Sequence, residues 1–180
     1  MALIYVGPGC GDGASSFAGG STYITQLNPS NDAGVIDYIC IWAAGVVTGV
    51  EVASFYNVGG NDYTTRGNVS LANLAVGLNE FSAPGDFAAF NIATGDFIGL
   101  YWTVGLVDAA SLGSGHLKLA GDNIPCTAAT FAAGSRWNPK IYATGISSGW
   151  ATGKILGDAP ALYAKINGEP IGNIAKINGF

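Results

Sequence analysis

The sequence predicts an all-β protein: an antiparallel two-sheet β-sandwich with jelly-roll-like topology, flanked by extended N- and C-terminal arms. Three observations lead to this prediction. Glycine fills 28 of the 180 positions, and only 11% of the residues are charged, whereas helical bundles and coiled coils are rich in charged helix formers. Short apolar runs alternate with turn clusters between residues 21 and 145. No segment combines helical periodicity with capping residues over several turns.

Composition also excludes several classes of protein. Hydrophobic residues make up 49% of the chain, which is too many for a disordered segment. The net charge is -5 and the isoelectric point about 4.5, so we expect no binding to nucleic acid, which requires a basic surface. The longest apolar stretch, residues 35–58, is interrupted by Asp37 and Glu51, so we expect no membrane span.

The first twenty residues are interpreted as an extended arm. Residues 7–20 are dominated by glycine and serine and offer few apolar anchors, which is typical of a linker. The short apolar run Leu3, Ile4, Tyr5 and Val6 would then be the part of this arm that contacts another subunit. The run is too short for a signal peptide and lacks a basic region before it, so we expect synthesis in the cytoplasm without one.

Residues 21–145 form the predicted sandwich domain. Eight strands are expected there: Thr22–Gln26, Val35–Ala43, Val50–Val58, Thr64–Leu71, Phe87–Ile92, Phe97–Val104, His116–Leu119 and Lys140–Ala143.

Two of these strands show a clear period of two. In residues 35–42 one face carries Ile36, Tyr38, Cys40 and Trp42. In residues 97–104 the better core candidates are Ile98, Leu100, Trp102 and Val104.

The C-terminal part is predicted to be a linker, residues 146–160, followed by a repeat tail, residues 161–180. Ala164–Gly168 returns unchanged as Ala175–Gly179, and each copy reads as a short strand followed by an Asn-Gly turn. A repeat this short cannot bury a core of its own, so the tail must dock on its own sandwich or on a neighbouring subunit. Residues 136–180 carry five basic and two acidic residues, net +3, and residues 1–135 carry two basic and ten acidic, net -8. Complementary charge favours docking between subunits.

The search for catalytic or metal-binding residues finds little. His116 is the sole histidine, and an ordinary position at a strand end explains it better than catalysis. Asp86, Asp96 and Asp122 each follow a glycine. They are interpreted as turn residues that bind nearby backbone N–H groups, with calcium binding as the alternative. Therefore no enzymatic activity and no cofactor are expected.

Three scattered cysteines, Cys10, Cys40 and Cys126, favour free thiols in a reducing compartment. A Cys10–Cys126 bridge is the alternative. Trp137 and Trp150 lie among Gly, Ser, Asn and Pro, so they are candidates for exposed aromatic side chains. Such side chains would stack on a sugar or, as the favoured alternative, anchor the core or a subunit interface.

Several strand and turn patterns together resemble the β-sandwich structural proteins of tailed phages and of environmental viral sequences. The resemblance covers about residues 21–145 and the repeat tail, and rests on Ser21–Ile24, Asn28–Pro29, Gly34–Ile36, Ile41–Ala44, Thr94–Tyr101 and the two Ala-Lys-Ile-Asn-Gly copies. It implies a building block of a virion or filament.

We therefore expect a non-enzymatic subunit that forms homo-oligomers or polymers, with other virion proteins as further partners, in a virion or an extracellular assembly. Its two arms would dock on neighbouring subunits by strand addition. The residues expected to make these contacts are Leu3, Ile4, Tyr5, Val6, Lys165, Ile166, Ile171, Ile174, Lys176 and Ile177. The alternative function is a lectin-like carbohydrate-binding module of a virion or fibre, with Trp137 and Trp150 as its aromatic contacts.

Overall fold

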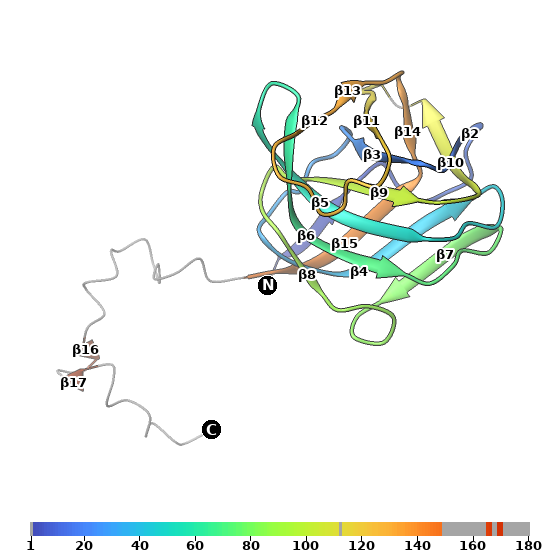
Figure 1. The fold of residues 1–180 in the computed structure, drawn as a ribbon. Coiled ribbons are helices and arrows are strands. Elements are labelled where there is room, and N and C mark those ends of the chain that lie inside the picture. The colour runs from blue at the N-terminus through green and yellow to red at the C-terminus, as the bar shows by residue number, and fades with distance from the viewer. Residues whose placement is uncertain (1, 112, 149–164, 167–168, 171–180) are drawn as a thin grey trace. The chain divides into compact units, whose positions relative to one another are not determined.

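Two antiparallel β-sheets pack face to face in the computed structural model, which describes residues 2–111, 113–148, 165–166 and 169–170 (Figure 1). The chain divides into a body, Met1–Ser147, and a C-terminal unit, Ser148–Phe180. Every regular element in the described part of the chain is a strand. The predicted all-β, two-sheet fold is therefore confirmed. No described helix is long and apolar enough to cross a membrane.

The first sheet, sheet A, is built around a long central strand, β4. Strand β15 pairs with one edge of β4, and β7 and β8 pair with the other edge, one after the other. Strand β1 extends the sheet beyond β15, and β10 carries β14 and β2. The strands of sheet A are β1 (Leu3–Val6), β2 (Ser15–Ala18), β4 (Gly34–Ala43), β7 (Gly77–Ser82), β8 (Phe90–Ile92), β10 (Leu106–Ser111), β14 (Trp137–Pro139) and β15 (Ile141–Ser147).

The second sheet, sheet B, has seven strands in the order β12-β6-β5-β9-β3-β11-β13. Their bounds are β3 (Ser21–Thr25), β5 (Val50–Gly59), β6 (Asp62–Leu71), β9 (Phe97–Trp102), β11 (His116–Ala120), β12 (Ala129–Thr130) and β13 (Ala132–Ala133). All eight predicted strands are present, with ends that shift by up to four residues. The sequence prediction missed β1, β2, β7, β10, β12, β13 and β14.

The main core lies between the two sheets and includes the predicted inward side of β9. Ile98, Leu100 and Trp102 are fully buried, as the alternation predicts. The prediction is wrong for Val104, which is 61% exposed. Strand β9 ends at Trp102, and Gly105 follows with φ +108°, so Val104 lies in a turn rather than on the core face.

A β-bulge at Asp37 corrects the predicted faces of β4. Tyr38 pairs with Thr144, but the next pair is Ile36 with Gly145, so Asp37 has no partner on β15. The extra residue reverses the side to which the preceding residues point. Ile36 therefore lies in the core with the other inward isoleucines of β4, and not on the face of Tyr38 as predicted.

The prediction of a free N-terminal arm is wrong for the segment that was expected to contact a neighbour. Leu3–Val6 forms β1, which pairs along its whole length with β15 of the same chain. Ile4 and Val6 are fully buried in the main core, and Leu3 and Tyr5 are exposed. The period-two alternation of these four residues thus serves the chain's own sheet. Strand β2 is likewise paired, with β10.

The outer face of sheet B is covered by the chain itself. Segment 121–133 crosses this face and buries Ile124 and Phe131 against it. These two side chains form a second, smaller core with outward-facing residues of sheet B, namely Ile24, Ala53, Phe55, Tyr63 and Leu117. Sheet B is therefore covered on its inner face and on the part of its outer face that carries this cluster, while Asn68 and Ser70 of β6 stay exposed on the outer face.

In the C-terminal unit the described residues are two short strands. β16 (Lys165–Ile166) pairs antiparallel with β17 (Glu169–Pro170), and Ile166 is opposite Glu169. β16 falls on the part of the first repeat copy that was predicted to be strand-like, and Asn167 and Gly168 lie outside the described residues. Ile146 and Ser147, which were assigned to the linker, belong to β15. The remaining predicted residues, Trp150, Ile171, Ile174, Lys176 and Ile177, lie outside the described part of the chain.

Candidate functional site

The outer face of sheet A carries several exposed large apolar side chains. Leu3 is 63% exposed, Tyr5 and Leu78 are each 47%, Ile146 is 44% and Val35 is 36%. Three further aromatic side chains on the same face, Tyr38, Trp42 and Tyr142, are partly exposed.

Strand register brings these residues together although they are far apart in the sequence. Leu3 is opposite Ile146, and Ile146 is opposite Val35 on the other side. These three side chains form one continuous row across β1, β15 and β4.

Two further rows run parallel to the first. Tyr5, Thr144 and Tyr38 are aligned across the same three strands. Trp42 is opposite Leu78 on β7. The face therefore presents one aliphatic row, and beside it rows in which aromatic side chains are mixed with other residues such as Thr144 and Leu78.

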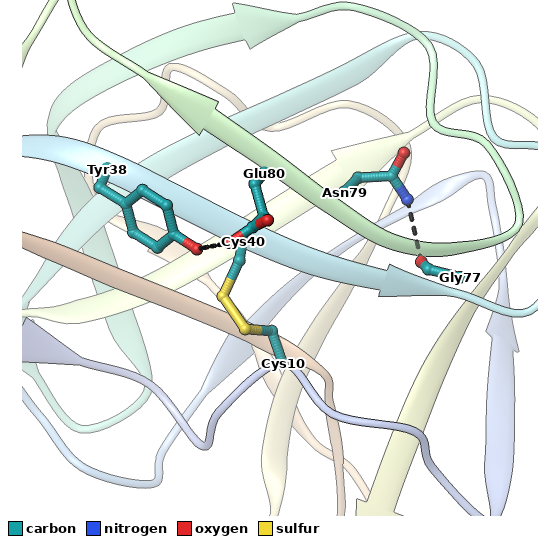
Figure 2. The surroundings of a disulfide bond; sticks show 6 residues. All are labelled: Cys10, Tyr38, Cys40, Gly77, Asn79 and Glu80. Carbon is teal, nitrogen blue, oxygen red and sulfur yellow. Dashed lines mark hydrogen bonds between the residues drawn. A yellow bond between two sulfur atoms is a disulfide. The ribbon is translucent and has the colours of Figure 1, made fainter.

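Charge is scarce on this face. Strands β1 and β15 contain no charged residue, β4 contains Asp37, and β7 contains Glu80. The hydroxyl of Tyr38 donates a hydrogen bond to Glu80 Oε1 at 2.5 Å (Figure 2). Burial, together with this bond to a carboxylate, raises the pKa of Tyr38 to about 12. The Tyr38 ring is thus fixed in a neutral form over the sheet.

A disulfide bond fastens the loop between β1 and β2 to the centre of this face (Figure 2). It joins Cys10 to Cys40, with Cα atoms 5.8 Å apart. The prediction of three free thiols is therefore wrong, as is the alternative Cys10–Cys126 pair, and Cys126 is the free cysteine. The pairing could be recognised only from the fold, because it depends on the outward direction of Cys40 on β4 and on the position of the Cys10 loop above it.

The edge of β1 that faces away from β15 is occupied by hydrogen bonds from a loop. The side chain of Asn31 accepts a hydrogen bond from the backbone N–H of Tyr5 and donates one to the carbonyl of Leu3. The side chain of Asn28 donates to the carbonyl of Gly7, and the backbone carbonyl of Asn28 accepts from the Gly7 N–H. A strand of another molecule cannot pair with β1 without displacing this loop.

A second exposed apolar cluster lies at one end of the body. Val46 is 62% exposed, Val76 67%, Val104 61% and Leu106 41%. Backbone hydrogen bonds hold their three loops together: Thr48 donates to Val104 and Ala44 to Leu106, while Val47 and Leu74 bond to each other. This cluster is purely aliphatic and is smaller than the outer face of sheet A.

The other residues that the sequence singled out serve the fold. His116 is 4% exposed, its Nδ1 lies 2.6 Å from the carbonyl oxygen of Trp137, and its ring contacts those of Phe17 and Tyr23. Burial lowers the pKa of His116. Trp137 itself is half-buried on β14.

The three glycine-following aspartates each bind backbone in their own turns, which confirms the turn interpretation. Asp86 accepts from the N–H of Ser82, Asp96 from Ala93, and Asp122 from Ile124. Asp96 also forms an ion pair with Arg66. No group of three His, Cys, Asp or Glu side chains that could hold a metal ion occurs in the part of the chain that the structure describes.

No family model, curated protein or solved structure matches this chain.

Proposed function

We propose that this chain is a non-enzymatic structural subunit that self-assembles into a virion component or a filament. The observation that carries this proposal is the contrast between the two sheets. The apolar cluster on the outer face of sheet B is covered by segment 121–133 of the same chain. The outer face of sheet A carries the loop that Cys10 fastens to Cys40, and beside this loop it exposes aromatic and aliphatic side chains with hardly any charge. Uncovered apolar surfaces of this kind mark interaction sites on soluble proteins.

The shape and chemistry of the face favour another protein surface as the partner. Sheet faces pack against one another through side chains of this kind, as in β-sandwiches. Tyr and Trp are enriched at the centres of protein interfaces, and charged residues are depleted there. In this proposal the C-terminal tail is the remaining arm, because the N-terminal segment is committed to its own sheet.

Sedimentation velocity over a wide range of concentrations tests the proposal, with negative-stain microscopy of the largest species. We expect regular oligomers or polymers. The informative variant is Ile146→Glu, which places a charge on the outer face of sheet A. It should weaken association by about tenfold or more, because burying an unpaired carboxylate costs more than ~1.4 kcal/mol.

The matched control is Val58→Glu. Val58 is 48% exposed and Ile146 is 44% exposed, so the two changes cost the monomer a similar amount of free energy. Val58 lies at the end of β5 in the other sheet, so its variant should associate like the parent chain. A parent chain that is monomeric at all concentrations overturns the proposal.

Carbohydrate binding is the second candidate, and the aromatic rings on the outer face of sheet A favour it. The rings on this face that could stack on sugars are Tyr5, Tyr38, Trp42 and Tyr142. A glycan array that compares the parent chain with Tyr142→Ala tests it. Binding that the variant loses supports this candidate, and an array without any binding removes it.

A further inference from the structure

Strand β7 is a six-residue strand with a free edge. It pairs with β4 through six consecutive residue pairs, from Gly77 opposite Ala43 to Ser82 opposite Tyr38. Among the described residues no strand pairs with its other side. In Figure 1 β7 lies at the margin of the body.

The backbone groups on that free edge can be identified from the ends of the strand. Ala83 donates its N–H to the carbonyl of Asp37 on β4, and Ser82 donates its N–H in the other direction, to Asp86 Oδ2. Because backbone groups alternate along a strand, the N–H and C=O groups of Leu78 and Glu80 also point away from β4. No described residue forms a backbone hydrogen bond with these four groups.

Several other sheet ends are short or protected. Strands β12 and β13, which end sheet B, have two residues each, and β14 has three. The edge of β1 is closed by the Asn28 and Asn31 side chains. Strand β2 and the part of β6 that follows Arg66 also have a side with which no described strand pairs, but neither carries an acidic residue beside an exposed apolar one, as β7 does with Glu80 and Leu78. An open edge of this kind is a template for strand addition to a strand with the complementary charge.

The tail offers a matching strand. In the first repeat copy, Lys165–Ile166 is already paired with Glu169–Pro170. The second copy has the sequence Ile174-Ala-Lys-Ile177, in which Ile174 and Lys176 are two residues apart. On β7, Leu78 and Glu80 have the same spacing and lie on the outer face of sheet A. About 26 residues separate Ser148 from Ile174, enough for an extended chain to span several tens of ångströms.

We infer that β7 accepts residues 174–177 of a neighbouring copy as an added strand. In the parallel alignment, Ile174 lies beside Leu78 and Lys176 beside Glu80. The added strand bonds to the outward backbone groups of β7, and the charge pair fixes its register. The open edge of sheet A is thereby closed by another copy of this chain. This inference rests on the proposed self-assembly and names the contact that produces it.

A charge-reversal cycle on the full-length chain tests the contact by sedimentation. Glu80→Lys and Lys176→Glu should each weaken association by about threefold to tenfold, since like charges across adjacent strands repel. The double variant should regain most of the parent affinity. Lys165→Glu is the matched control, because the first repeat copy is paired within its own unit, and it should leave association within about twofold.

Hydrogen exchange on the unmodified chain gives an independent measurement. The amides of Leu78 and Glu80 should exchange slowly in the assembled state and quickly at concentrations where the chain is monomeric. Two results would overturn this inference while the proposed self-assembly stands. One is assembly in which the amides of Leu78 and Glu80 still exchange quickly, and the other is a double variant that associates no more tightly than either single variant. A chain that never assembles overturns both.

Discussion

Loss of the Cys10–Cys40 disulfide should destabilise the body substantially. The bond joins residues 30 positions apart. The chain-entropy relation for a loop of that length gives about 3.6 kcal/mol at 25 °C. For a domain of this size each kcal/mol corresponds to about 2 to 4 °C in Tm, so the Cys10→Ala/Cys40→Ala variant should melt about 7 to 14 °C below the parent chain.

The assay combines calorimetry with a thiol count. Denatured but unreduced parent protein should show one reactive thiol, that of Cys126. Cys126→Ala is the control, and it should shift Tm by only a few degrees because it breaks no cross-link. Three reactive thiols in the unreduced protein, or an unchanged Tm in the double alanine variant, would refute the reasoning.

Three further predictions concern single side chains. The pKa of His116 is lowered by burial, so the unfolded chain binds the proton more readily. The contribution of neutral His116 to the free energy of unfolding should be fully present above about pH 6.5 and should be lost as the pH falls below that value. Urea unfolding at several pH values should show this dependence in the parent chain and not in His116→Gln. The phenol of Tyr38, with its pKa raised to about 12, should ionise at lower pH in Glu80→Gln, as ultraviolet titration of the two proteins will show. A Cβ on Gly145 would collide with backbone of β4, so Gly145→Ala should cost more than ~2 kcal/mol in thermal unfolding; Gly11→Ala, which meets nothing within 4 Å, should cost almost none.

The strands that could be predicted are those whose local pattern is strong. Ile98, Leu100 and Trp102 alternate cleanly and are all fully buried. Strand β7 reads Gly77-Leu-Asn-Glu-Phe-Ser82 and β10 carries Asp108, so neither displays an apolar run. They are strands because partners elsewhere in the sequence pair with them: β4 with β7, and mainly β2 and β14 with β10.

The N-terminal error has the same physical origin. Leu3–Val6 is four residues long and is followed by a glycine-rich loop, so the local sequence is only a weak signal for a strand in the chain's own sheet. Its partner, β15, is about 140 residues away in the chain. Pairing at that separation is decided by the whole sheet, and no window of sequence contains it.

Neither the disulfide nor the outer face of sheet A could be predicted from the sequence, for a related reason. The faces of β4 could be assigned only in part, because the bulge at Asp37 reverses them within the strand. Without that register, Cys40 could not be placed under the Cys10 loop, nor Val35 beside Ile146. Side-chain alternation predicts two faces for a strand, but the sheet's neighbours decide which face is covered.

The low charge of the chain therefore has two sources. Part of it belongs to sheet B, where segment 121–133 packs on an apolar cluster of the outer face; that part needs no second molecule. The other part belongs to sheet A, where Leu3, Tyr5 and Ile146 stay exposed on β1 and β15, two strands that contain no charged residue. The chain closes the β1 edge of this sheet with asparagine side chains and leaves β7 open. A protein that only had to stay monomeric would gain from a bulge or a covering segment at that edge, where Glu80 is the one charged residue of β7. The open edge, more than the composition as a whole, is therefore the reason to expect assembly.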